Sequence, residues 1–194
     1  DLQREIYSLE DDISKDEALS NKVDLDINYP WESADKISQD FKKRDKWQSI
    51  LMPSGAMVAG RTDQKHWLTF GTIDVLPILY GNYPILMTSD NAQAAVRIGE
   101  LINDPSKESA RAINWSTIPA GKDINVRMSG LVWPEASQRI ANSAYLTREK
   151  VGKGQVILFS GEPNYRGSAL GTNRLWLNAV IYGAGLGSNS EIDL

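Results

Sequence analysis

The spacing of the apolar residues changes at about residue 50 and divides the chain into two parts. In the first part, apolar residues recur at helical spacing at Leu2, Ile6, Leu9 and Ile13. This spacing predicts an amphipathic helix. A polar, acidic stretch follows, and Pro30 opens a second predicted helix. We therefore expect residues 1–49 to form an acidic helical extension or connector.

Short apolar runs replace the helical spacing after residue 50. Residues 52–59, Val75–Tyr80 and 84–88 are bounded by Gly, Pro and Asp, a pattern that predicts strands. The dipeptide Gly81-Asn82 separates the last two runs. It is a hairpin signal, because glycine adopts positive φ at little steric cost. The sequence thus predicts a hairpin at this point.

Two prolines indicate where these strands lie in the sheet. Pro77 and Pro84 have no N–H to donate to a neighbouring strand, so both strands are predicted at an edge. Residues 94–101 fit either a strand or a helix. Residues 103–123, which contain two prolines and a glycine, are predicted to form a surface insertion.

The last third of the chain has the clearest pattern. It predicts a short helix over 134–141, a strand over 143–150, a turn over 151–154, a strand over 155–160 and a helix over Leu170–Tyr182. The apolar run at 155–160 shows no alternation, so this strand is predicted to be buried on both faces. Gly183 is a typical helix stop.

These elements predict an α/β domain over residues 50–185, with a mixed sheet and flanking helices, followed by a frayed tail at 186–194. An apolar content of 41% supports a core of this size. The net charge of −4 argues against a nucleic-acid surface, which relies on clustered Lys and Arg. No apolar run approaches the ~20 residues that span a bilayer.

The composition limits the chemistry that the chain can perform. It has no cysteine and a single histidine, His66, so cysteine nucleophiles and thiolate zinc sites are excluded. A lone histidine beside Trp67 is more typical of a packed or hydrogen-bonding residue than of a catalytic triad. A pair among the 25 acidic residues leaves a carboxylate-dependent hydrolase open as a weaker alternative.

The loop after residue 160 is the candidate ligand site, because it follows a predicted buried strand. Arg166 is suited to bind a carboxylate or phosphate, Asn164 and Tyr165 to add hydrogen bonds, and Thr172 to contribute to an anion seat at the following helix. Structural roles are the alternative, with Arg166 paired to an acid and Asn164 shaping the turn. Asn178, within an apolar helix, is expected to bond a buried backbone group.

Three segments of the last third carry a resemblance to a known family. They are VGKGQVILF at 151–159, PNYRG at 163–167 and GTNRLWLNA at 171–179. Together they resemble the C-terminal, class I glutamine amidotransferase-like region of secreted bacterial zinc carboxypeptidases. The upstream segments 52–57, 65–71 and 129–134 fit the same pattern.

The resemblance implies a class I glutamine amidotransferase-like or flavodoxin-like fold, incomplete at the N-terminal side. It places the zinc and the catalytic residues in a preceding peptidase domain, so no cofactor is expected within this segment. An amidotransferase triad requires a cysteine, which the chain lacks. The implied location is periplasmic or secreted, and the implied partners are the preceding domain and a homo-oligomer.

We therefore expect a non-catalytic accessory domain that supports structure, oligomerisation or substrate positioning in a zinc carboxypeptidase-like protein. The alternative from the residues is a module that binds a small ligand, peptide terminus or sugar through the loop at 162–167.

Overall fold

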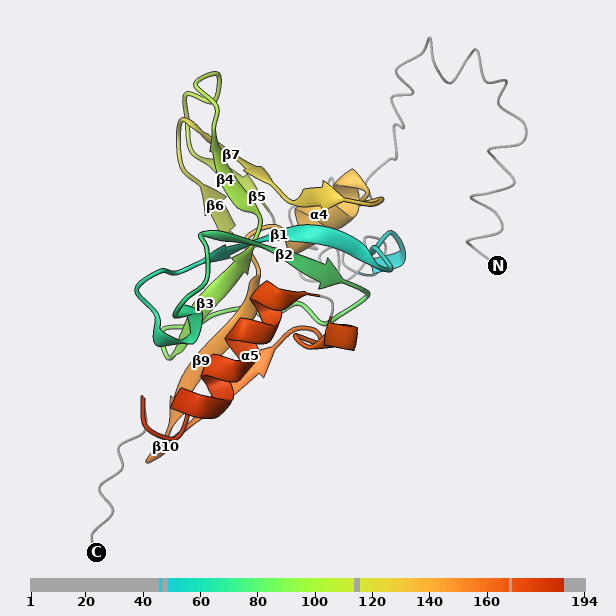
Figure 1. Ribbon diagram of the computed structural model, residues 1–194. Coiled ribbons are helices and arrows are strands. Elements are labelled where there is room, and N and C mark those ends of the chain that lie inside the picture. Colours follow the sequence, from blue (N-terminus) through green and yellow to red (C-terminus); the bar gives the residue numbers. More distant parts are fainter. Residues whose placement is uncertain (1–45, 47–48, 114–115, 168, 187–194) are drawn as a thin grey trace, which may run out of the picture. The chain divides into compact units, whose positions relative to one another are not determined.

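The computed structural model describes residue 46 and residues 49–113, 116–167 and 169–186. The chain divides into two units, Asp1–Arg44 and Asp45–Leu194, and all described residues belong to the second. The helices predicted over residues 1–49 and nearly all of the predicted tail therefore lie outside the described residues. The described part is mixed α/β, with a curled antiparallel sheet and two α-helices (Figure 1).

The main sheet has six strands in the order β10-β9-β3-β1-β2, with β8 also paired to β1. Its members are β1 (Ala56–Thr62), β2 (Val75–Tyr80), β3 (Ala92–Ile98), β8 (Arg127–Ser129), β9 (Ala144–Val151) and β10 (Gly154–Phe159). One edge of β1 pairs with β2. The other edge is shared by β8 near its start and β3 near its end. β1 is thus the centre of the domain.

Close packing around β1 requires a glycine at residue 60. A Cβ at Gly60 would lie 2.9 Å from Ile78 Cγ1 and 3.3 Å from Val96 Cγ1. Both of these side chains are fully buried, and interiors packed to this density do not accommodate an added methyl group without strain. The missing side chain therefore lets β2 and β3 close over β1.

A β-rich arm leaves the sheet where β3 ends. Gly99, at φ +97°, turns the chain outward, and its N–H donates to the Ala59 carbonyl at 2.7 Å. The arm contains two antiparallel ribbons: β4 (Glu100–Asn103) with β7 (Lys122–Asn125), and β5 (Arg111–Ile113) with β6 (Ser116–Ile118). The described residues of the predicted insertion at 103–123 therefore belong to these ribbons and their turns (Figure 1).

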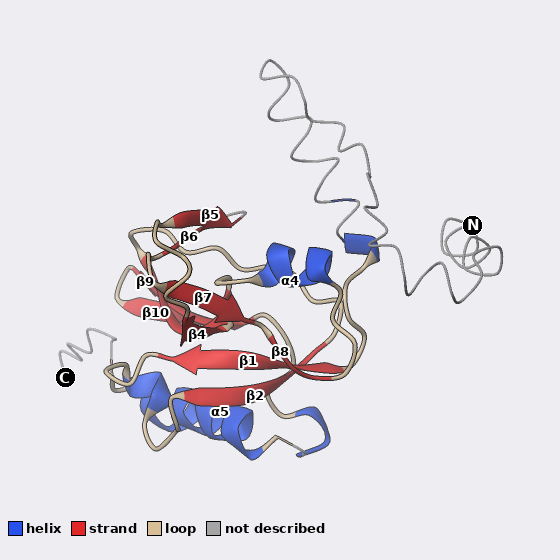
Figure 2. Cartoon of the chain, turned by 90° about the horizontal axis from the view of Figure 1, so that it is seen from above, coloured by secondary structure: helices blue, strands red, loops and turns tan. Residues whose placement is uncertain are grey.

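The two α-helices lie on opposite sides of β1 and β2 (Figure 2). α4 (Pro134–Ile140) buries Ala136 and Ile140. α5 (Leu170–Tyr182) packs against the short 3₁₀ helix η2 (Trp67–Thr69) and against β2. A second 3₁₀ turn, η3 (Tyr165–Gly167), precedes α5. None of the helices in the described ranges has the length and apolar content that a bilayer crossing requires.

Several sequence predictions are confirmed. β2 and α5 have the predicted bounds, and α4 and β9 lie within one residue of theirs. Residues 94–101, whose sequence fits either a strand or a helix, belong to β3 and β4, which the turn at Gly99 separates. The predicted strand at 52–59 begins later, at Ala56, and continues to Thr62. Pro77 lies in β2, which is an edge strand as expected.

The predicted hairpin at Gly81-Asn82 is wrong. β2 pairs with β1 instead, and residues 84–88 contribute only an isolated bridge between Leu86 and Ala144. The Tyr83 N–H donates to the Gly81 carbonyl at 2.8 Å. This tight turn sends the chain toward β9, because the long-range pairing with β1 prevails over the local turn signal.

The predicted burial of residues 155–160 is also wrong. β10 is an edge strand in an antiparallel hairpin with β9, and Val156 and Leu158 are 41% and 48% exposed. All described strand pairs are antiparallel, so the sheet predicted to be mixed shows no parallel pair among them. The crevice that forms beyond the carboxyl ends of parallel strands therefore has no counterpart among the described strands.

Candidate functional site

The loop at 162–167 presents two of the predicted site residues to solvent. Asn164 and Arg166 are exposed, and Tyr165 is half-buried. Arg166 adopts φ +50°, and its guanidinium lies 5.1 Å from the centre of the Tyr165 ring. This distance is typical of a cation–π contact. The structure therefore brings Tyr165 and Arg166 together.

Thr172 has a structural role at the start of α5. Its hydroxyl donates to the Pro163 carbonyl at 2.7 Å, with the Ala169 carbonyl at 3.1 Å, and the residue is buried. The same hydroxyl thus ties the loop to the helix. An anion bound to the Thr172 hydroxyl, as predicted, would have to displace these hydrogen bonds.

Asn178 fulfils its predicted role as a ligand of buried backbone groups. Its side-chain amide donates to the carbonyls of Leu68 and Phe70, at 2.9 Å each. These carbonyls belong to η2 and to the residue that follows it, and a helix leaves such groups without internal partners. Asn178 therefore fixes η2 against α5.

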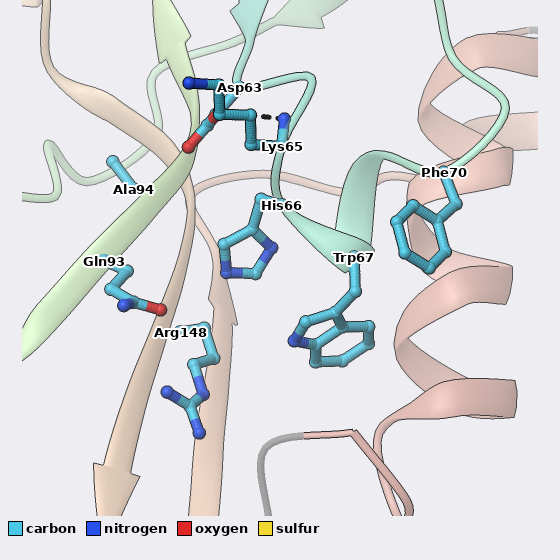
Figure 3. A pocket seen from close by; sticks show the side chains of 8 residues that line it. All are labelled: Asp63, Lys65, His66, Trp67, Phe70, Gln93, Ala94 and Arg148. Atoms are coloured by element: carbon cyan, nitrogen blue, oxygen red, sulfur yellow. Dashed lines mark hydrogen bonds between the residues drawn. The ribbon is translucent and has the colours of Figure 1, made fainter.

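A cavity of about 520 Å³ opens beside η2 (Figure 3). It is lined by Asp63, Lys65, His66, Trp67, Phe70, Gln93, Ala94 and Arg148. Its volume lies within the usual range of small-ligand pockets, about 300–1,000 Å³. One wall is aromatic and the other carries amide and cationic groups, so the cavity suits an amphipathic ligand.

His66 is held in this cavity by the start of η2. Its Nδ1 accepts the Leu68 N–H at 3.1 Å, which caps the 3₁₀ helix. Its ring stacks on Trp67, with centroids 5.7 Å apart. The prediction that His66 packs and hydrogen-bonds is confirmed.

Gln93 and Arg148 face the His66 ring from two paired strands (Figure 3). The register of β3 shifts between Ala94 and Val96, and this bulge alters which residues of β3 share a face. Arg148 is positioned by Gln155, whose Oε1 accepts from the Arg148 Nε at 2.7 Å. The pairing of β3 with β9 is long-range and has no local sequence signal, so the sequence did not reveal this grouping.

The protonation of His66 follows from its surroundings. Burial lowers the pKa of His66, the Asp63 carboxylate and the Gln93 side chain oppose this effect, and Arg148 adds to it. The net result is a pKa below the ordinary value, so the ring is neutral at pH 7. Because Nδ1 is an acceptor, the proton lies on Nε2. This buried Nε2–H has no hydrogen-bond partner of ordinary geometry within the described residues.

The outward face of α5 is a second candidate surface. The helix buries Thr172, Leu175 and Asn178. Its exposed side chains include Leu170, Trp176, Leu177, Val180 and Ile181. Phe70, which is also exposed, extends this surface through an edge contact with Tyr182 at 6.1 Å. We call these six exposed residues the α5 surface.

Comparisons with known proteins and a search for metal-ligand groups were also made for this chain. No family model, curated protein or solved structure matches this chain. Within the described ranges, no group of three or more His, Asp or Glu side chains is placed to hold a metal ion.

Proposed function

We propose that the chain is a non-catalytic accessory module that docks onto another protein domain through the α5 surface. The observation that carries the proposal is the reversed polarity of α5. It buries Thr172 and Asn178 but leaves Val180 and Ile181 60% and 64% exposed. A helix at the surface of a globular domain normally shows the opposite arrangement.

Energetics support docking as the role of this surface. Complete burial of an aliphatic side chain contributes ~1.5–3 kcal/mol relative to full exposure. The side chains of the α5 surface are exposed in the described fold, so their burial by a partner would still contribute much of this free energy. Contiguous apolar patches of this kind mark interaction sites. Arg174, which is also exposed on α5, donates from its Nε to the Phe70 carbonyl at 3.1 Å and adds one positive charge beside the α5 surface.

The family resemblance suggests which partner this is. We propose the zinc carboxypeptidase domain that would precede this region, which makes the chain similar in role to the amidotransferase-like C-terminal region of that family. The zinc would then reside in the peptidase domain, and the location would be periplasmic or secreted. These assignments rest on the sequence segments quoted above.

Titration of the chain against such a peptidase domain, followed by calorimetry, tests the proposal. Ile181→Glu places a charge on the α5 surface and should weaken binding at least tenfold. Thr117→Glu adds the same charge at an exposed position on the arm and should bind like the wild type. Wild-type binding that survives Ile181→Glu would overturn the proposal, as would self-association that the same variant abolishes.

A second candidate function is the binding of a small ligand in the cavity beside η2. It is favoured by the buried Nε2–H of His66, which faces Gln93 and Arg148 and makes no hydrogen bond of ordinary geometry to the described residues (Figure 3). An acceptor oxygen of a ligand would satisfy this donor while its apolar part contacts Trp67 and Phe70. The site differs from the predicted loop at 162–167, none of whose residues lines the cavity.

A thermal-shift titration with phenylacetate, with benzyl alcohol as the uncharged comparison, tests this second function. A ligand at 100 times its dissociation constant adds about 2.7 kcal/mol of stability. We expect phenylacetate to raise the melting temperature of the wild type and not of His66→Asn. An equal shift in both proteins would contradict binding at His66.

A further inference from the structure

Two arginines lie side by side at the base of the arm, and neither lines the cavity or belongs to the α5 surface. Arg61 in β1 and Arg97 in β3 are register partners in an antiparallel pair. Residues paired in this way project from the same face of a sheet, with Cβ atoms ~5 Å apart. Both side chains are partly buried. The two positive charges are therefore close neighbours.

Among the described residues, both arginines hydrogen-bond to neutral oxygens only. Arg61 Nη2 donates to Asn142 Oδ1 at 2.8 Å, and its Nη1 lies 3.4 Å from the Gly99 carbonyl. Arg97 Nη1 donates to the Asn142 carbonyl at 3.2 Å, and its Nη2 donates to Thr88 Oγ1 at 3.1 Å. In the described part of the chain, neither arginine forms an ion pair with a carboxylate. The two adjacent cations thus have no carboxylate partner among the described residues.

Asn142 organises the pair from the loop between α4 and β9. Its side chain binds Arg61 and its backbone carbonyl binds Arg97, while its own N–H donates to the Ile98 carbonyl at 2.8 Å. It adopts φ +58°, a conformation that costs free energy for a residue other than glycine. Both guanidinium groups are therefore held in place before any ligand arrives.

The electrostatics of the pair oppose the folded state. Burial lowers the pKa of both arginines, and the charge of Arg97 lowers that of Arg61 further. Arginine nevertheless stays protonated in proteins, so both charges persist. Like charges directly opposite each other in a sheet are destabilising. A dianion that contacts both groups would remove this repulsion.

We infer that Arg61 and Arg97 form a binding site for a phosphate-type dianion, with Asn142 and Thr88 positioning the two guanidinium groups. Guanidinium forks match the oxygen geometry of phosphate and bind it bidentately. The two formal positive charges match the charge of a dianion, whereas a single carboxylate would neutralise only one of them. The site goes beyond the docking role proposed for the chain, since it involves neither the α5 surface nor the cavity beside η2.

Isothermal titration with inorganic phosphate tests the inference in the complete chain, and chloride at equal ionic strength is the reference. The same titration with phenyl phosphate distinguishes an organic phosphate ester from the free ion. We expect phosphate to bind the wild type and to bind Arg61→Gln and Arg97→Gln at least tenfold more weakly. Arg127→Gln, a control that removes an exposed charge of β8 from the same sheet, should bind like the wild type.

Stability without ligand supplies an independent readout. Relief of the like-charge repulsion should leave the melting temperature of Arg97→Gln unchanged or raise it in phosphate-free buffer. If this variant does not fold, Arg97→Lys keeps the charge and loses the fork, and should fold with weakened phosphate binding. The inference is overturned if phosphate acts no differently from chloride on the wild type. Equal weakening in Arg127→Gln would also overturn it, since this would show general screening.

Discussion

Asn178 and Phe70 are 108 residues apart in the chain, yet the Asn178 side-chain amide donates to the Phe70 carbonyl at 2.9 Å. The same amide group binds the Leu68 carbonyl. Through these two bonds, α5 fixes the position of η2, the segment that begins just after His66. The cavity beside η2 and the α5 surface therefore share one structural support.

Replacement of Asn178 should destabilise the whole domain. Asn178→Leu leaves the buried Leu68 carbonyl without a donor, whereas the Phe70 carbonyl keeps the Arg174 Nε–H. An unsatisfied buried polar group costs ~1–3 kcal/mol. Chemical denaturation should show this loss in the free energy of unfolding. Asn164→Ala, at an exposed position in the loop, is the matched control and should change it by less than about 0.5 kcal/mol. Equal effects of the two substitutions would contradict the support role of Asn178.

A methyl group at residue 60 should strain the centre of the sheet. Gly60→Ala forces Ile78 and Val96 apart, and overpacking of this kind costs typically ~1–3 kcal/mol. Gly154→Ala is the control, because its Cβ would meet only the Val151 carbonyl at 3.8 Å. Thermal unfolding of both variants checks the prediction. A Gly60→Ala protein as stable as Gly154→Ala would show that β1 to β3 are less tightly packed than described.

Stability should depend on pH through His66. The folded-state pKa of His66 is below the unfolded value of about 6.5. The unfolded chain therefore binds the proton more strongly, and the contribution of His66 is complete above pH 6.5 and decreases as the pH falls toward the folded pKa.

Unfolding free energies of the wild type and His66→Asn, compared from pH 8 to pH 5, isolate this contribution. The wild type should lose stability relative to the variant as the pH falls. A constant difference would contradict the lowered pKa, and a difference of opposite slope would indicate a raised pKa.

Local signals in the sequence predicted the elements that depend on local interactions. The apolar run ended by Gly183 located α5, and the proline-opened segment at 134 located α4. Asn178 was assigned correctly because a buried amide within an apolar helix requires a backbone partner. Pro77 indicated an edge strand because proline has no N–H to donate to a neighbouring strand, and this is a property of the residue itself.

Features that depend on long-range pairing could not be predicted in this way. The apolar run in β10 indicated burial, yet its place at the sheet edge depends on which strands pair with β9. Arg61 and Arg97 lie 36 positions apart, and only the register of β1 and β3 brings them together. Likewise, Gln93 lies beside Arg148 because β3 and β9 pair in this register, which no local residue pattern marks.

The docking role of α5 can be tested most directly with a cysteine at residue 181. The chain has no cysteine of its own, so the rate of thiol modification in Ile181→Cys reports the exposure of this one position. Docking predicts rapid modification in the isolated chain and at least tenfold slower modification when the carboxypeptidase domain is bound. Glu108→Cys, exposed on the arm, should react rapidly in both states. Equal reactivity of Ile181→Cys with and without that domain would contradict docking through the α5 surface.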